Sequence, residues 1–262
     1  MDQLAGKTAV VTGGGAGIGR GLCLGFAGEG MNVVVVDRDA DRAREVTAEI
    51  DATGAKALAQ TCDVADQAAV DRVRDAALAA FGSVDVLCNN AGVVQFGPVA
   101  EAPQEDWDWL FAVNVWGVVN VIRSFTPQMR KQGAGHIVNT ASLSGTFAVP
   151  GLGVYTASKY AVMGISETLR QELKGDGIGV SVLCPGPVRS RINEAARNRG
   201  GLERMGAIEG LPRLGWREPA DAARVVIAGI KANRQYIYTH AKGEAGVEMR
   251  FKEMIADFAV AP

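Results

Sequence analysis

Short apolar segments recur along this chain, and helical patterns lie between most of them. The segments that read as strands are Lys7–Thr12, Asn32–Val36, Lys56–Cys62, Val84–Cys88, His136–Thr140, Gly179–Cys184 and Tyr236–Thr239. Helical periodicity begins near Ile18 and recurs over 40–52, 66–81, 105–132 and 154–174. Strands that are apolar on both faces are typical of a parallel sheet covered by helices on both sides. The alternation therefore predicts an α/β fold with a doubly wound parallel sheet in a three-layer α/β/α arrangement.

Length and charge limit what the chain can do. Its 262 residues suit a single domain, assigned to 1–262, with a substrate-loop insertion at about 189–218 and a C-terminal helical extension at about 241–262. The net charge is only −2, so charge favours neither a nucleic-acid partner nor a membrane partner. No apolar run reaches the ~20 residues that span a bilayer, and no basic leader opens the chain. The expected location is the cytoplasm.

The metal-ligating residue types are scattered. The cysteines sit among apolar neighbours without CxxC spacing and read as small core residues; they are Cys23, Cys62, Cys88 and Cys184. Only two histidines occur, His136 and His240, which are too few for a histidine-based metal site. No metal is expected.

Glycines and polar residues follow the ends of the strands. Ligands of open α/β sheets bind beyond the carboxyl ends of the strands. After the first strand, Gly13, Gly17 and Gly19 have the spacing G-x-x-x-G-x-G, which differs from the strict G-x-G-x-x-G. Glycines in such a turn let the backbone approach a pyrophosphate at a helix N-terminus. The turn therefore indicates a nucleotide site.

Asp37 ends the second strand, twenty residues after Gly17. A carboxylate there can accept hydrogen bonds from an adenosine ribose and repels a 2′-phosphate, which favours NAD over NADP. Arg38 follows directly and can pair with a 2′-phosphate, so NADP stays open as the alternative.

A phenol and an ammonium lie one helical turn apart at Tyr155 and Lys159. Residues four apart share a helix face, and a fixed cation favours the phenolate form of a tyrosine. This predicts a proton acceptor usable near neutral pH. The competing interpretation is an ordinary surface pair, since Tyr-x-x-x-Lys alone is not specific. Ser142 lies thirteen residues before Tyr155.

Taken together and in order, Thr12–Gly19, Asn89–Gly92, Asn114, Ser142, Tyr155-x-x-x-Lys159 and Pro185-Gly186 resemble the short-chain dehydrogenase/reductase family over roughly residues 5–190. The resemblance implies a Rossmann-type fold with about seven strands and a nicotinamide cofactor. It also implies that Tyr155 is the acid/base, that Lys159 holds the nicotinamide ribose and lowers the pKa of Tyr155, and that Ser142 bonds the reacting oxygen. By the same resemblance, Asn114 anchors a water next to Lys159.

The resemblance also implies the cofactor contacts. Asp63 and Val64 would meet the adenine, Asn90 the adenosine side, and Val188 and Ser190 the nicotinamide carboxamide. The other implied cofactor residues are Ile18, Ala91, Gly92, Pro185 and Gly186, with Gly13, Gly17, Gly19, Asp37, Arg38, Tyr155 and Lys159 as above.

Substrate choice is expected in residues 143–153, Val93–Phe96 and 187–215. An apolar pocket is expected from Val94, Phe96, Leu143, Phe147, Val149, Leu152 and Met205, although core packing is an equal interpretation for each. The arginines Arg189, Arg191, Arg197 and Arg199 can meet an acidic substrate, but a solvated charged loop is the favoured interpretation. The segments SRINEAARNRG and YIYTHAKGEAG are distantly similar to bacterial dehydrogenases of lignin-derived aryl alcohols.

The sequence thus predicts an NAD-dependent oxidoreductase that interconverts a secondary alcohol and its ketone, with a medium or bulky apolar substrate. An NADPH-dependent carbonyl or 3-oxoacyl reductase is the alternative. A non-catalytic nucleotide sensor is a third hypothesis, which the complete Asn–Ser–Tyr–Lys set opposes. The family resemblance implies a homotetramer, or a homodimer. For the C-terminal extension, packing on its own domain and a subunit contact both stay open.

Overall fold

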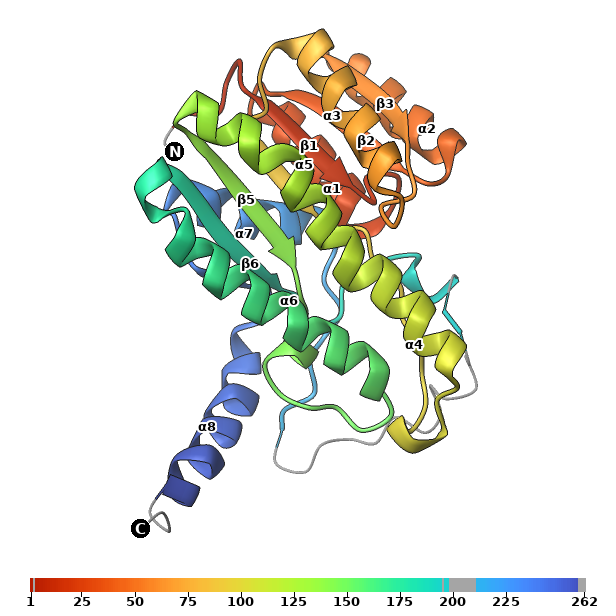
Figure 1. The fold of residues 1–262 in the computed structure, drawn as a ribbon, viewed down its shortest axis with the longest axis vertical. Helices are drawn as coiled ribbons and strands as arrows, with labels where there is room; N and C mark the ends of the chain where they lie inside the picture. The colour runs from red at the N-terminus through yellow and green to blue at the C-terminus, as the bar shows by residue number, and fades with distance from the viewer. Residues whose placement is uncertain (2, 195, 198–210, 259–262) are drawn as a thin grey trace.

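The computed structural model describes residues 1, 3–194, 196–197 and 211–258 (Figure 1). Met205 and Arg199 lie outside the described residues. The predicted strands form one sheet in the order β3-β2-β1-β4-β5-β6-β7, and every neighbouring pair is parallel. The strands are β1 (Thr8–Thr12), β2 (Asn32–Asp37), β3 (Ala57–Thr61), β4 (Val86–Asn89), β5 (Gly135–Thr140), β6 (Ile178–Cys184) and β7 (Tyr236–Tyr238). The predicted doubly wound fold is confirmed.

The helices cover the sheet in two layers because the strand residues alternate between its faces. On β2, Val33 and Val35 face one apolar core, whereas Val34 and Val36 face the other. Helices α1, α2 and α7 pack on the first face, and α3, α5 and α6 on the second. The helices are α1 (Gly17–Gly28), α2 (Ala40–Asp51), α3 (Gln67–Phe81), α4 (Gln104–Phe111), α5 (Gly117–Gln132), α6 (Gly153–Glu172), α7 (Pro219–Lys231) and α8 (Glu244–Phe258).

Local signals set several helix ends. The Asp39 carboxylate accepts hydrogen bonds from the N–H groups of Asp41 and Arg42 and begins α2. Asp66 does the same for α3 through Ala68. Helix α3 ends at Gly82, whose φ of 78° lies in the left-handed region that glycine adopts at little cost.

Two features of the helices were not anticipated. The segment 105–132 is helical, as predicted, but it consists of α4, a π-helical segment, Ala112–Trp116, and then α5. A π segment inserts a residue into the helical repeat, and periodicity over a long window does not detect it. Helix α7 was not predicted at all. Its signal was present, since Pro219 occupies the first turn of a segment rich in alanine and valine.

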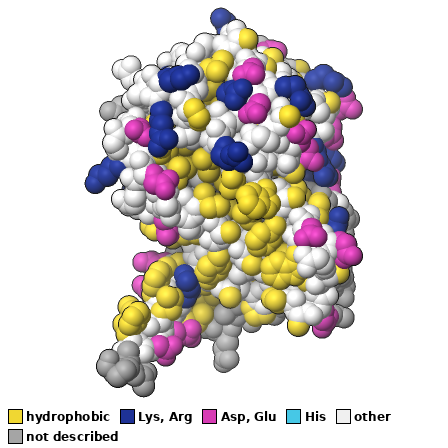
Figure 2. Space-filling model, viewed as in Figure 1, with side chains coloured by type: hydrophobic (Ala, Val, Ile, Leu, Met, Phe, Trp, Pro, Cys, Tyr) yellow, Lys and Arg dark blue, Asp and Glu magenta, His cyan; other side chains and the backbone are white. Residues whose placement is uncertain are grey.

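Helix α8 extends away from the body of the domain (Figure 1). Its first turns pack on the domain, where Arg250 stacks on Tyr160 at 4.8 Å and donates to the Thr146 carbonyl oxygen at 3.2 Å. Its apolar residues farther along are exposed; they are Phe251, Met254, Ile255 and Phe258. Figure 2 shows hydrophobic side chains along this helix and in the middle of the same face of the molecule. Packing on the domain therefore accounts for only the beginning of the helix.

Among the described helices, none is both long and apolar enough to cross a membrane.

Candidate active site

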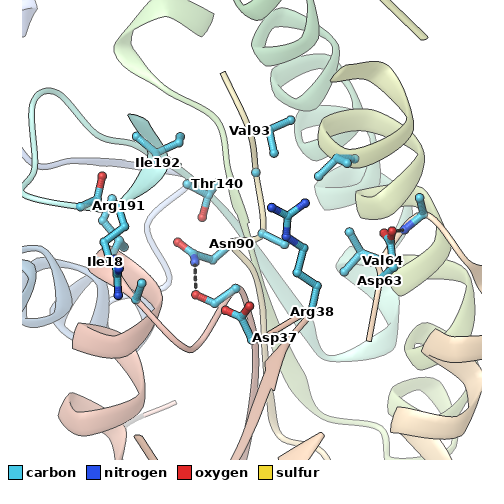
Figure 3. A pocket seen from close by; sticks show the side chains of 18 of the residues that line it. Ile18, Asp37, Arg38, Asp63, Val64, Asn90, Val93, Thr140, Arg191 and Ile192 are labelled. Atoms are coloured by element: carbon cyan, nitrogen blue, oxygen red, sulfur yellow. Dashed lines mark hydrogen bonds between the residues drawn. The ribbon is translucent and has the colours of Figure 1, made fainter. Parts of the chain in front are cut away.

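A cleft of about 350 Å³ opens at the carboxyl ends of the strands. It lies over β1 and β4, the neighbours at which the strand order reverses direction. The expected cofactor residues that line it are Gly13, Gly17, Ile18, Asp37, Arg38, Asp63, Val64, Asn90, Ala91, Gly92, Tyr155, Lys159, Pro185 and Ser190. Figure 3 shows the labelled members converging from the ends of several strands. The sheet topology thus gathers motifs that are far apart in the sequence.

The glycine turn leaves room that side chains would fill. Gly13 and Gly17 have φ values of 64° and 51°, which few other residues adopt. A Cβ at Gly19 would lie 1.9 Å from the Gly13 carbonyl oxygen, so the turn closes tightly on the start of α1. Ala16, at the N-cap of α1, gives no side-chain cap. Unpaired N–H groups at that helix end suit an anionic group such as a pyrophosphate.

Asp37 and two arginines line the same part of the cleft. The Asp37 carboxylate accepts from the Gly15 N–H at 2.9 Å and from the Asp39 N–H at 3.0 Å. The Arg38 side chain extends into the cleft (Figure 3). Arg42, which sequence reasoning missed, also lines it; Arg42 ion-pairs with Asp39 at 3.1 Å and with Glu194 at 3.4 Å. An acid that favours NAD therefore stands beside two cations that suit a 2′-phosphate.

Thr12, at the end of β1, fixes the segment after β4. Its hydroxyl accepts from the N–H groups of Asn90 and Ala91 at 3.0 and 3.1 Å. The Asn90 side chain in turn donates to the carbonyl oxygens of Thr12 and Gly13. Figure 3 shows one of these bonds as a dashed line. The glycine turn and the Asn-Asn-Ala-Gly segment are therefore held as one unit. The sequence motif Thr12–Gly19 includes this threonine, but the motif alone predicts no role for its hydroxyl.

Ser142, Tyr155 and Lys159 come together beside the cleft, and two of them, Tyr155 and Lys159, line it. Tyr155 lies in the first turn of α6, and Lys159 one turn later on the same face, with its Nζ 5.5 Å from the Tyr155 ring centre. Ser142 follows β5 in an extended conformation and hydrogen-bonds with Tyr155. Lys159 is buried and donates to the Thr140 carbonyl oxygen at 2.9 Å.

The pKa values of this pair depart from the expectation. Burial raises the pKa of Tyr155, and the hydrogen bond with Ser142 opposes that rise. Burial also lowers the pKa of Lys159 to about 8, against a smaller opposite effect of Cys184. The expected lowering of the Tyr155 pKa by Lys159 is not found in the protein alone, because the ammonium bonds to a backbone carbonyl and desolvation dominates.

Asn114 lies within the π-helical segment and is fully buried. Its side-chain oxygen accepts from the Val93 N–H at 2.9 Å, and its amide donates to the Val93 carbonyl oxygen and to Ser158. A Cβ added at Gly92 would lie 3.3 Å from the Asn114 oxygen and 3.5 Å from Lys159 Nζ, so the two groups flank the same glycine. The π segment thus places an amide beside the lysine.

The expected substrate residues separate into two groups. Val94, Phe96 and Leu152 form an apolar cluster against which Val149 and the Tyr155 ring pack. Leu143 and Phe147 pack instead beneath the start of the C-terminal extension, next to Gly243 and Gly246. The first group adjoins the candidate catalytic phenol, whereas the second supports α8.

The expected arginines are paired with acids. Arg189 pairs with Glu218, Arg191 with Glu194, and Arg197 with Asp106 at 3.0 Å. The Arg197 guanidinium also lies 4.3 Å from the Trp109 ring centre. These pairs support the charged-loop interpretation over recognition of an acidic substrate.

Some assignments fall outside the cleft lining, and some lining residues were missed. The assigned cofactor and catalytic residues that do not line it are Gly19, Asn114, Ser142, Gly186 and Val188. The described substrate-pocket residues also lie outside its lining; they are Val94, Leu143, Phe147, Val149 and Leu152. The lining residues to which no role was assigned are Ala16, Arg42, Ala65, Trp109, Ala112, Val113, Thr140 and Ala141. Val93, Arg191 and Ile192 also line it and belong to segments expected to choose the substrate, and Cys62 was expected only in the core. Several of these directly adjoin an assigned residue, and that adjacency is the signal that could have found them.

Comparisons with known proteins agree with this geometry. A family model described as short chain dehydrogenase matches residues 7–200. The 1-deoxy-11-beta-hydroxypentalenate dehydrogenase of Streptomyces exfoliatus is 34% identical over 98% of this chain and 91% of its own length. The C alpha-dehydrogenase of a Sphingobium strain is 34% identical over 99% and 88%.

The solved structures point the same way. The crystal structure of a short-chain dehydrogenase/reductase from Burkholderia phymatum in complex with NAD has a TM-score of 0.89 and 36% identity, covering 98% of this chain and 97% of that one. With its parallel sheet, glycine turn and Ser–Tyr–Lys arrangement, the chain belongs to the short-chain dehydrogenase/reductase family of oxidoreductases.

Proposed function

We propose that the protein is an NAD-dependent oxidoreductase that interconverts a secondary alcohol and its ketone. The observation that carries this proposal is the meeting of Ser142 with Tyr155 and Lys159, two residues that line a cleft containing the glycine turn and Asp37. The cradle at Gly13, Gly17 and Gly19 and the uncapped start of α1 fit a pyrophosphate. The Asp37 carboxylate fits a ribose diol.

In this proposal each residue has a distinct task. Tyr155 takes the hydroxyl proton of the alcohol, or returns it to the ketone oxygen. Ser142 holds the same oxygen by a hydrogen bond. Lys159 and Asn114 hold the cofactor ribose and a proton route beside it. When bound, the nicotinamide accepts or donates the hydride.

The proposed substrate is a medium or bulky, mostly apolar secondary alcohol, a class that includes aryl alcohols. The cluster of Val94, Phe96 and Leu152 beside Tyr155 supports an apolar substrate because it offers no charge to the bound molecule. The pairing of Arg197 with Asp106 removes one cation that an acidic substrate would need.

A second candidate is an NADPH-linked carbonyl or 3-oxoacyl reductase. It is favoured by Arg38 and Arg42, which line the cleft next to Asp37. Initial rates with NAD⁺ and NADP⁺ at equal concentration separate the two proposals, and a large preference for NADP⁺ would overturn the first.

The decisive experiment is a screen of NAD⁺ reduction across aliphatic, alicyclic and aryl secondary alcohols, followed by the Tyr155→Phe variant on the best substrate. We expect kcat to fall by about 10²–10⁴ because the acid/base is lost, while NADH still binds. Tyr160→Phe is the matched control, since it removes a phenol from the same helix away from the cleft. A Tyr155→Phe variant that keeps more than a tenth of the activity contradicts the assigned role.

A further inference from the structure

The segment Pro185–Ser190 follows β6, lines the cleft with Pro185 and Ser190, and is the segment that the family resemblance places at the nicotinamide end of the cofactor. We call it the nicotinamide shelf. Backbone hydrogen bonds from two other segments of the chain hold it in place. The Leu143 N–H, next to Ser142, donates to the Pro185 carbonyl oxygen at 3.0 Å. The backbone of Arg217 bonds with both Pro187 and Arg189, at 3.0 and 2.9 Å.

His240 connects these supports, although it does not line the cleft. The Thr239 hydroxyl accepts from the Gly186 N–H at 3.1 Å and lies 2.7 Å from His240 Nδ1. His240 Nε2 lies 2.9 Å from the Gly215 carbonyl oxygen, two residues before Arg217. One imidazole therefore bridges the shelf and the segment that pairs with it.

The partners assign the hydrogens of this network. A carbonyl oxygen can only accept, so Nε2 must carry the hydrogen that meets Gly215. In the neutral imidazole Nδ1 is then an acceptor, and the Thr239 hydroxyl donates to it while accepting from Gly186. In that tautomer each hydrogen bond of the network has one direction, and its buried polar atoms are satisfied.

The ring also packs closely against the shelf. A Cβ added at Gly186 would lie 2.7 Å from His240 Nδ1 and 3.0 Å from Cγ. Glycine at 186 is therefore explained by the imidazole above it. The His240 carbonyl oxygen accepts from the Gly243 N–H, and Gly243 packs on Leu143, so the contacts return to the serine segment.

We infer that His240 is a positioning residue for cofactor binding, which holds the nicotinamide shelf through Gly186 and Gly215. The inference rests on the proposed function, because the shelf has a nicotinamide to hold only if the protein uses the proposed cofactor. It gives His240 a task in the reaction without contact with substrate or hydride.

The test compares NADH affinity in variants of the two histidines. We expect His240→Ala to raise the Kd for NADH by about tenfold, the effect of losing buried hydrogen bonds that order a binding segment. His136→Ala is the matched control, because His136 is also buried and hydrogen-bonded, through Ser181, but lies at the opposite edge of the sheet. It should lower the melting temperature and change the Kd less than about twofold.

Two conservative variants separate positioning from general loss of structure. In His240→Asn the amide oxygen can replace Nδ1 as the acceptor for Thr239, and in His240→Gln the amide nitrogen can replace Nε2 as the donor to Gly215. Each should recover part of the affinity, and they keep the test available if His240→Ala does not fold. The inference is overturned if folded His240 variants bind NADH as wild type does, or if His136→Ala weakens binding equally. Failure of wild type to bind NADH would instead reject the proposed function, and the inference with it.

Discussion

His136 and His240 lie at opposite edges of one sheet, and each ring packs against a glycine of the β6 segment. A Cβ at Gly179 would lie 2.5 Å from His136 Nδ1, as one at Gly186 would approach His240. His136 Nε2 meets the Ser181 hydroxyl at 2.7 Å, and that hydroxyl donates to the Arg234 carbonyl oxygen. These partners belong to the scaffold, whereas the partners of His240 belong to segments next to the cleft. The same arrangement therefore supports the fold at one edge and a binding segment at the other.

Charged groups show the same difference between the edges. At the amino edge, the Asp85 carboxylate accepts from Lys7 Nζ, the Thr8 N–H and the Ser83 hydroxyl. At the carboxyl edge, Lys159 is 4% exposed and forms no salt bridge with any described residue. The scaffold pairs the Asp85 carboxylate with Lys7 at the first edge, whereas at the second it buries the Lys159 cation without a salt bridge to any described residue. The second arrangement costs stability, because burial favours the neutral amine.

The largest expected effect concerns Lys159. Its pKa is lowered to about 8 by burial, below the ordinary value of 10.5. Between these values the unfolded chain binds more protons than the folded one, so this group makes the protein more stable as pH rises. The free energy of unfolding of wild type relative to Lys159→Met should therefore increase by roughly 2–3 kcal/mol from pH 7 to pH 10 in the cofactor-free protein.

Urea unfolding at a series of pH values measures this difference. Lys131→Met is the control, because Lys131 is exposed at the end of α5 and its removal should give no comparable trend. If the difference in free energy of unfolding between wild type and Lys159→Met does not change with pH, burial of Lys159 does not destabilise the protein. The proposed difference between the two edges would then be wrong.

The second prediction concerns the amino edge. Asp85→Ala leaves the Thr8 N–H without its acceptor and separates Lys7 from its acid, so we expect a loss of about 1–3 kcal/mol in the free energy of unfolding. Activity per folded molecule should stay within about twofold, because Asp85 does not line the cleft. Asp75→Ala, which breaks an exposed pair with Arg74, should cost less than about 1 kcal/mol. An equal loss in both variants would contradict a special role for Asp85.

The sequence was sufficient for the sheet because its strands are apolar on both faces, as the alternating valines of β2 show. It was insufficient for the π segment at Asn114, since a single inserted residue does not change the wider periodicity. Arg42 was missed because its entry into the cleft depends on how α2 leaves β2, which no local pattern records.

The site differs from the fold for a related reason. Tyr155 and Lys159 could be paired from their spacing, because four residues make one helical turn. Their pKa values could not, because these depend on burial by residues from other elements. His240 lay beyond sequence reasoning for the same cause: its partners at Gly186 and Gly215 precede it by 54 and 25 residues.

The smallest expected effect tests whether the carboxyl edge keeps its charges for a ligand. Asp37 stands beside Arg38 and Arg42 in the cleft, so Asp37→Ser removes the group that repels a 2′-phosphate and leaves the cations that attract one. We expect the ratio of kcat/KM for NADP⁺ to that for NAD⁺ to rise about tenfold. The double variant Asp37→Ser with Arg38→Ala should lose most of this gain, because the remaining arginine, Arg42, is already paired with Asp39 and Glu194. The melting temperature should again distinguish the two edges. Asp85→Ala should lower it without changing the preference between NAD⁺ and NADP⁺, whereas Asp37→Ser should mainly change that preference. An unchanged ratio, together with a large loss of stability, would show that Asp37 serves the scaffold through its bonds to Gly15 and Asp39.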